Sequence, residues 1–162
     1  MPGLPEESHR LRPDHLPTPF TATQIRDASR PGRTVRSRIV RSGAEPVVRV
    51  TKFVSGDADG GVHESWTETP SGERLTEPER GHSTWLELQE HASMPADRTR
   101  IDEETFEIPA GRFEGWRYTR TDDDGVHVFW FARSAPGMPL RYEVQAGDEV
   151  VFSSTVVEIR ED

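Results

Sequence analysis

The chain has 162 residues, a formal net charge of −9 at pH 7 and no cysteine. The length fits a single domain with one modest core. The acidic balance argues against nucleic acid as a partner, because such binding needs a positively charged surface. Without cysteine, a disulfide framework, a thiolate nucleophile and a cysteine metal site are excluded.

Residues 1–19 carry five prolines. Proline fixes φ and removes a backbone N–H donor, so this segment is a poor helix and a poor central strand. We expect a disordered or loosely attached arm at 1–19 and a single domain at 20–162, anchored first by Phe20. The chain shows neither a signal-peptide stretch nor an apolar run of membrane length, which predicts a cytoplasmic protein without membrane insertion.

A short helix is expected directly after Phe20. Thr21 and Gln24 have the spacing of a capping box, Ile25 and Ala28 share one face, and Pro31-Gly32 ends the helix. Three segments rich in β-branched residues follow, separated by turn residues. They predict antiparallel strands at residues 33–41, 46–54 and 62–69.

The spacing of apolar residues then changes from that of a strand to that of a helix, which predicts a second helix. We expect Ser83 to cap it and Pro95 to end it, with Trp85, Leu88 and Ala92 on one apolar stripe. Its opposite side, with Glu87 and Glu90, is predicted to face solvent. A helix between two sets of strands covers the open face of their sheet most easily, so we expect it beside the first helix.

The second half of the chain has the pattern of an antiparallel meander. Aromatic and β-branched segments alternate with Gly- and Pro-rich turns and predict five strands, at about residues 100–108, 112–121, 126–133, 140–145 and 150–159. Gly115 is a candidate β-bulge that would point Phe113 and Trp116 to the same side. The predicted fold class is therefore α+β, a curved half-barrel-like antiparallel sheet of about eight strands around two short helices.

The strand at 126–133 differs from its neighbours because both of its faces are apolar. Val126, Val128 and Trp130 alternate with His127, Phe129 and Phe131. Such a strand either lies beneath covering elements on two sides or lines a hydrophobic cavity.

Catalytic and metal motifs are weak throughout. His63 and His127 could meet across the sheet with Glu64 or Glu143, but no histidine pair has the spacing of a helical zinc motif. The acidic turns at 57–60 and 122–125 lack the further ligands of a calcium loop, and hairpin turns explain them. Ser153-Ser154-Thr155 offers hydroxyls without a nucleophile motif. We expect no metal, no cofactor and no catalytic residue.

Arginines gather around the first predicted strand. Arg36 and Arg38 project from one face and could clamp a carboxylate or a phosphate. The favoured alternative is a solvated strand face whose arginines pair with glutamates of 62–69 across the sheet.

Aromatic residues exceed what one face of a thin sheet needs. They either fill a core or surround a concave pocket between sheet and helices. The candidate pocket residues are Trp66, Trp85, Trp116, Tyr118, Phe129, Trp130, Phe131 and Tyr142, with Arg117 or Arg141 at the rim for a polar head group.

Four stretches resemble those of a group of uncharacterised bacterial proteins: S-T-W-L-E-L-Q-E-H-A, P-A-G-R-F-E-G-W-R-Y, F-W-F-A and P-G-M-P-L-R-Y-E. That group is similar in turn to the half-barrel family of lipoprotein carriers, the LolA- and LppX-like proteins. The resemblance covers residues 83–158. It implies a curved antiparallel sheet wrapped around one or two helices that can hold an acyl chain.

We therefore expect a protein that binds a small hydrophobic or lipid-like molecule between sheet and helices. The alternative is a protein–protein interaction or self-association module, a homo-oligomer without ligand or catalysis. An enzyme is the least favoured class, because no nucleophile and base stand at an informative spacing.

Overall fold

The structure is a computed structural model that describes residues 8–161. Its strands are β1 (Thr34–Arg41), β2 (Val47–Gly56), β3 (Gly60–Glu68), β4 (Glu79–Thr84), β5 (Thr99–Ile108), β6 (Gly111–Asp122), β7 (Gly125–Ala132), β8 (Arg141–Ala146) and β9 (Glu149–Arg160), and its helices are α1 (Ala22–Ala28) and α2 (Trp85–Glu90). All nine strands of the described chain form one open antiparallel sheet in the order β4-β3-β2-β1-β9-β8-β7-β6-β5. The predicted fold class is confirmed.

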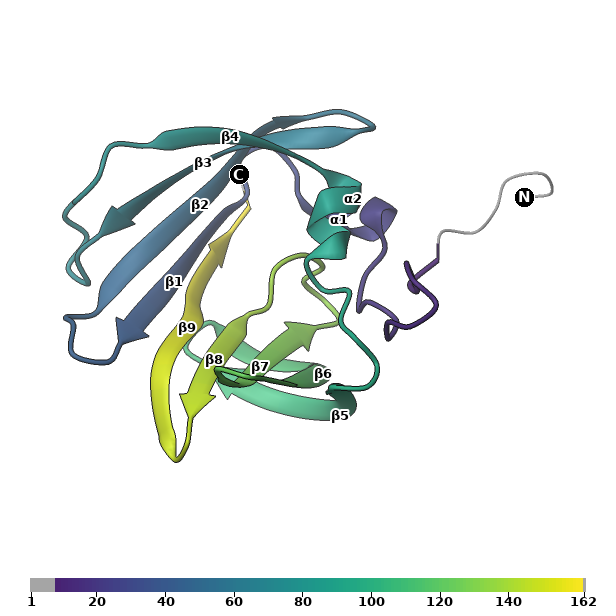
Figure 1. The fold of residues 1–162 in the computed structure, drawn as a ribbon. Coiled ribbons are helices and arrows are strands. Elements are labelled where there is room, and N and C mark those ends of the chain that lie inside the picture. Colours follow the sequence, from purple (N-terminus) through teal and green to yellow (C-terminus); the bar gives the residue numbers. More distant parts are fainter. Residues whose placement is uncertain (1–7, 162) are drawn as a thin grey trace.

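The sheet is strongly curved. Figure 1 shows the two halves, β1–β4 and β5–β8, diverging on either side of β9, with both helices at the opening between them. Each predicted strand is present, with ends that differ from the prediction by two residues or fewer. Within the described residues, neither helix is long and apolar enough to cross a membrane.

Strand β4 was not predicted from the sequence. Its residues, E-R-G-H-S-T, include no large apolar side chain. The strand forms because β3 offers a free backbone edge, with which Gly61 pairs Ser83 and Glu64 pairs Arg80. Backbone hydrogen bonding, rather than side-chain burial, therefore defines this edge strand.

The prediction of a bulge at Gly115 is wrong. Its register with both neighbouring strands is continuous, and Phe113 and Trp116 belong to different apolar clusters. A Cβ atom at position 115 would lie 1.7 Å from the carbonyl oxygen of Phe131. Glycine is required here because the backbone of β7 approaches too closely for any side chain.

Both helices begin with a capping box. In α1 the Thr21 hydroxyl accepts from the Gln24 N–H at 3.3 Å and the Gln24 side chain accepts from the Thr21 N–H at 2.9 Å, as predicted. In α2 the cap is Thr84 rather than Ser83. Ser83 is instead the penultimate residue of β4, so strand and helix follow each other without a loop.

The described part of the N-terminal arm, residues 8–19, is attached rather than loose, which corrects the prediction. The Leu16 N–H donates to the Met94 carbonyl at 2.9 Å, and the Tyr118 hydroxyl donates to the Pro17 carbonyl at 2.7 Å. Thr18 is buried. Proline-rich backbone retains its carbonyl acceptors, and these are what anchor the segment. The remainder of the predicted arm, residues 1–7, lies outside the described residues.

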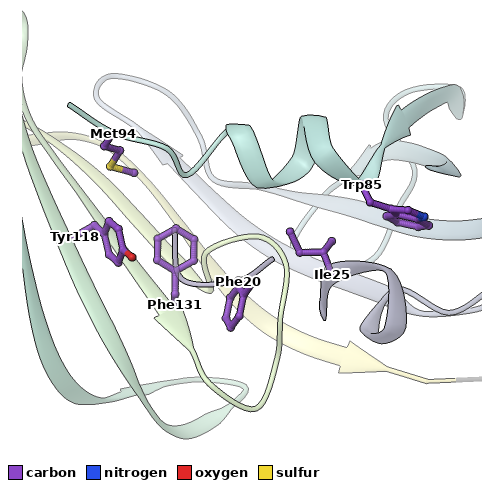
Figure 2. Close-up of a cluster of buried hydrophobic side chains, with 6 residues drawn as sticks. All are labelled: Phe20, Ile25, Trp85, Met94, Tyr118 and Phe131. Atoms are coloured by element: carbon purple, nitrogen blue, oxygen red, sulfur yellow. The ribbon is translucent and has the colours of Figure 1, made fainter. Parts of the chain in front are cut away.

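The main apolar cluster joins the helices to β6 and β7. It comprises Phe20, Ile25, Trp85, Met94, Tyr118 and Phe131 (Figure 2). Phe20 packs edge-on against Phe131 and Trp116, at ring-centroid distances of 6.2 and 5.9 Å. The predicted anchoring role of Phe20 is thereby confirmed, and the cluster fixes both helices over one face of the sheet.

Candidate functional site: a cavity between sheet and helices

The strand registers separate two faces of the sheet. Residues directly opposite on neighbouring strands point to the same face, and successive residues point to opposite faces. Phe53 lies opposite His63, and Phe131 lies opposite Trp116, all on the face that meets the helices. We call this the inner face and the opposite side, which includes Trp130, the outer face.

A cavity of about 390 Å³ lies between the inner face and the helices. The lining comes from α1, α2, five strands and the loop after β7, and most of it is apolar. The apolar lining residues are Ile25, Val35, Phe53, Leu88, Ala92, Phe129, Phe131, Ala135, Pro136, Met138, Pro139 and Leu140. The volume lies within the range of about 300–1,000 Å³ that is usual for small-molecule sites.

Few polar side chains line this cavity. His63 Nε2 and the Ser83 hydroxyl lie 3.2 Å apart, and the His63 ring packs edge-on against Phe53. Arg33 donates from Nη1 to the Ala28 carbonyl at 2.7 Å. The remaining polar lining residues are Ser29, Thr51 and His91. An apolar space with a few placed polar groups is the usual composition of a ligand site.

Six of the predicted pocket residues lie on the inner face or in the main apolar cluster, but only two line the cavity. Phe129 and Phe131 contribute to its lining. Trp85 and Tyr118 are buried in the main cluster, and Trp116 packs against it. Tyr142 continues the inner face beyond the cavity, where its ring stacks on Phe129 at 4.7 Å.

The other four predicted pocket residues lie on the outer face: Trp66, Trp130, Arg117 and Arg141. The Trp130 indole donates to Glu104, which also pairs with Arg117 at 2.9 Å. The Arg141 guanidinium lies over the Trp130 ring at 5.0 Å. These groups contact one another on the outer face of the sheet, so neither arginine stands at the rim of the cavity.

Sequence reasoning missed the loop from Ala135 to Leu140 and the side chain of Arg33. The Pro-Gly-Met-Pro run was interpreted only as a turn, yet its residues form one side of the cavity. The signal that could have indicated Arg33 is its position at the start of the first predicted strand, where alternation with Val35 places both side chains on one face.

Arg36, on the outer face of β1, forms ion pairs, as the favoured alternative predicted for it. Arg36 pairs with Glu68 of β3 and, at 3.2 Å, with Glu158 of β9. The Trp66 indole also donates to Glu68 at 2.8 Å. With two carboxylates already bound, Arg36 is a structural group rather than an open anion clamp.

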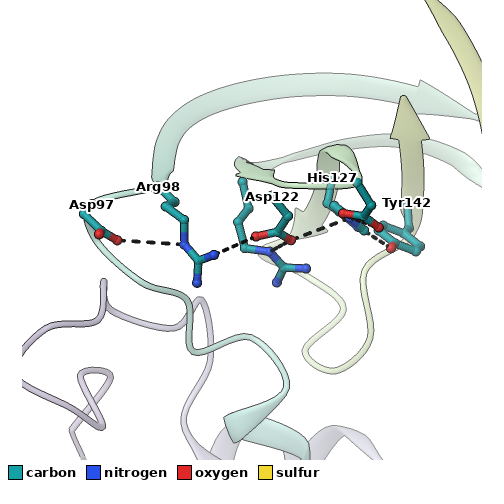
Figure 3. Close-up of polar contacts among 7 residues, drawn as sticks. Asp97, Arg98, Asp122, His127 and Tyr142 are labelled. Carbon is teal, nitrogen blue, oxygen red and sulfur yellow. Dashed lines mark hydrogen bonds and ion pairs between the residues drawn. The ribbon is translucent and has the colours of Figure 1, made fainter. Parts of the chain in front are cut away.

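A polar cluster surrounds His127 at the turn between β6 and β7 (Figure 3). Asp122, Asp124 and His127 offer three ligand atoms within 4.8 Å of one another, the arrangement a metal ion could use. However, Asp122 already pairs with Arg120 at 2.7 Å, and His127 Nδ1 lies 2.7 Å from the Tyr142 hydroxyl. Protein contacts therefore account for this cluster.

The hypothesis of a histidine–glutamate site is not supported by the geometry. His63 and Glu64 are adjacent on β3 and therefore point to opposite faces. His127 contacts Asp124 and Tyr142, whereas Glu143 pairs with Arg141 on the outer face. These four groups do not converge on one cleft.

Comparison with known proteins finds no match to this chain, either among protein-family models or among curated proteins.

Proposed function

We propose that this protein binds a small hydrophobic or lipid-like molecule in the cavity between its sheet and helices. The observation that carries the proposal is the cavity of about 390 Å³ with its largely apolar lining. Protein interiors are packed to crystal-like density, and space of this size between well-packed elements is uncommon without a use.

The arrangement of the fold supports the same proposal. The sheet is curved, and α1 and α2 lie at the opening between its two halves (Figure 1). Ile25 on α1 and Leu88 on α2 both contribute to the lining. The resemblance of residues 83–158 to a group of bacterial proteins that are similar in turn to lipoprotein carriers adds support, since a sheet of that fold can hold an acyl chain.

The experiment is a binding titration with N-phenyl-1-naphthylamine, a neutral probe that fluoresces in apolar surroundings. Ala92 lines the cavity and is half-buried, so Ala92→Phe should occupy part of the space and reduce probe binding. Leu86, exposed on α2, provides the matched control, and Leu86→Phe should bind the probe like the wild type. Native mass spectrometry of the protein from cell extract should show an apolar molecule bound.

Equal probe binding by wild type and Ala92→Phe would contradict the proposal, as would the absence of binding by the wild type. Trp130→Ala gives a second control, because Trp130 lies on the outer face and its removal leaves the cavity unchanged.

Self-association is a second candidate function. It is favoured by the open sheet, whose two ends are the edge strands β4 and β5 with one backbone edge each outside the sheet. Sedimentation velocity over a hundredfold range of concentration tests it: a sedimentation coefficient that rises with concentration supports association, and a constant monomer value rejects it.

A further inference from the structure

The side chains of Arg33, Phe53 and His63 form one row across the inner face. The Phe53 N–H donates to the Arg33 carbonyl at 2.9 Å, and Phe53 lies opposite His63 in the register of β2 and β3. All three residues line the cavity. Because neighbouring strands lie about 4.8 Å apart, Arg33 and His63 are separated by roughly 10 Å, with the phenyl ring between them.

Arg33 is a buried cation with a weak counter-charge. Only 7% of the residue is exposed. Burial lowers the pKa of its guanidinium, and the negative charge of Glu161 opposes that shift. Arginine nevertheless stays protonated at neutral pH. Glu161 approaches Nε only to 3.4 Å, and its own side chain is 60% exposed.

A buried charge is stable when an ion or hydrogen-bond partner accompanies it. Among the described residues, Glu161 is the one ion-pair partner of Arg33, and the Ala28 carbonyl accepts from Nη1. A guanidinium offers five N–H donors in a fork that matches the two oxygens of a carboxylate. Arg33, which lines the cavity, therefore retains N–H donors for one more anion.

We infer that the molecule held in the cavity is a hydrophobic monocarboxylate, with its carboxylate bound by Arg33 and its apolar body against Leu88, Phe129 and Phe131. The inference rests on the proposed function and specifies the chemical class of the ligand. A neutral apolar molecule would leave the guanidinium without a further partner. An amine would place a second positive charge beside it.

His63, at the other end of the row, is a weaker binding site for a carboxylate. His63 is already within hydrogen-bond distance of Ser83 and packs on Phe53. Arg33 carries a full positive charge at neutral pH, so the carboxylate is assigned to Arg33.

The test uses the full chain and the displacement of N-phenyl-1-naphthylamine by three probes of equal length: dodecanoate, dodecan-1-ol and dodecylamine. A charge-assisted hydrogen bond in a buried site corresponds to about tenfold or more in affinity. We therefore expect dodecanoate to bind about tenfold more tightly than dodecan-1-ol, and dodecylamine most weakly.

Variants then assign the preference to Arg33. Arg33→Gln should abolish the preference for the acid while leaving dodecan-1-ol affinity unchanged, whereas Glu161→Gln should strengthen dodecanoate binding by removing a competing carboxylate. Arg30→Gln is the control, since Arg30 is exposed and lies outside the cavity lining. If Arg33→Gln does not fold, the wild-type preference and the Glu161→Gln response decide the matter.

The outcomes separate the two proposals. If the naphthylamine probe and all three competitors fail to bind, the proposed function itself is rejected. If the probe binds but acid and alcohol compete equally, the cavity binds apolar molecules and the inference about the carboxylate is rejected.

Discussion

The side-chain oxygen of Gln89 accepts a hydrogen bond from the backbone N–H of Ala22 at 3.0 Å, so a side chain of α2 binds the first turn of α1. The Gln89 amide nitrogen donates to the carbonyl of Ser8 at 2.9 Å and to the hydroxyl of Thr18 at 3.0 Å. Only 2% of Gln89 is exposed. One buried carboxamide therefore connects both helices to the N-terminal segment.

Replacing Gln89 by leucine should destabilise the protein. The Ala22 N–H and the Thr18 hydroxyl would lose a partner within a buried region, and an unsatisfied buried polar group costs about 1–3 kcal/mol. We expect the free energy of unfolding in urea, followed by tryptophan fluorescence, to fall by about 2–3 kcal/mol. Gln145→Leu is the control, because Gln145 is half-buried and its amide contacts Glu143 at 3.3 Å. Equal stability of the two variants would contradict this role of Gln89.

Gly115 allows a second stability prediction. A methyl group there would lie 1.7 Å from the Phe131 carbonyl oxygen, which belongs to the backbone and cannot rotate away. We expect Gly115→Ala to break the pairing of β6 with β7 and to cost more than about 3 kcal/mol, or to prevent folding. Circular dichroism and urea unfolding measure both outcomes.

Gly43→Ala is the matched control for that variant. Gly43 has φ of +77°, and no atom of the described residues lies within 4 Å of an added Cβ, so backbone strain is the expected cost. A cost of about 1–2 kcal/mol is expected. Should the two alanine variants prove equally stable, close approach of the strands would not be the reason for glycine at 115.

Much of the fold could be predicted from the sequence because each strand buries alternating side chains and ends at a turn. The exception, β4, is held by backbone pairing to β3 and buries no large apolar group. The segment before Phe20 is a similar case: its anchoring acceptors are the carbonyls of residues such as Pro17, and composition does not indicate their partners.

The composition of the site was predicted better than its geometry. Phe129 and Trp130 are adjacent aromatic residues on one strand, and alternation requires that they face opposite ways. Which of them meets the helices depends on the curvature of the sheet and on Glu104, a residue of β5 that binds the Trp130 indole. Neither the curvature nor the position of Glu104 can be read from the residues next to Phe129 and Trp130 in the sequence. The prediction that both aromatics share one pocket therefore assigned outer-face residues to the cavity.

The ionised carboxylate of Glu68 should stabilise the fold near neutral pH, and this contribution should be lost at acid pH. Burial alone would raise the pKa of its carboxyl, but hydrogen bonds from Trp66 and Arg36, with the charges of Arg36 and Arg74, outweigh burial and lower it. A carboxyl whose pKa is lower in the folded than in the unfolded state stabilises the fold at any pH above the unfolded pKa, about 4.3. This contribution is lost as the pH falls.

Urea unfolding between about pH 6.5 and 3 tests that prediction, since the unfolded carboxyl titrates near 4.3. Glu68→Gln should be less stable than the wild type at the upper end, and the difference should shrink as the pH is lowered. Glu90→Gln, on the exposed side of α2, should follow the wild type at every pH. A difference between wild type and Glu68→Gln that is independent of pH would contradict the assignment.

Tyr118 should have the opposite effect, at alkaline pH. Its hydroxyl donates to the Pro17 carbonyl at 2.7 Å, and burial raises the pKa of the phenol far above its ordinary value. A phenol whose pKa is raised in the folded state gives stability that is fully present when the pH is below the unfolded pKa, about 10. This stability is lost as the pH rises further. Tyr118→Phe should lower stability by about 1 kcal/mol at neutral pH, through the lost hydrogen bond.

The same variant should lose stability less steeply than the wild type above about pH 10, because the ionisation that favours the unfolded chain is gone. The chain has only two tyrosines, so the ultraviolet absorbance of tyrosinate can be assigned by comparison with Tyr142→Phe. In that variant the remaining phenol, Tyr118, should ionise only together with unfolding. If it titrates while the protein stays folded, burial does not control this group, and the N-terminal segment must open to solvent at high pH.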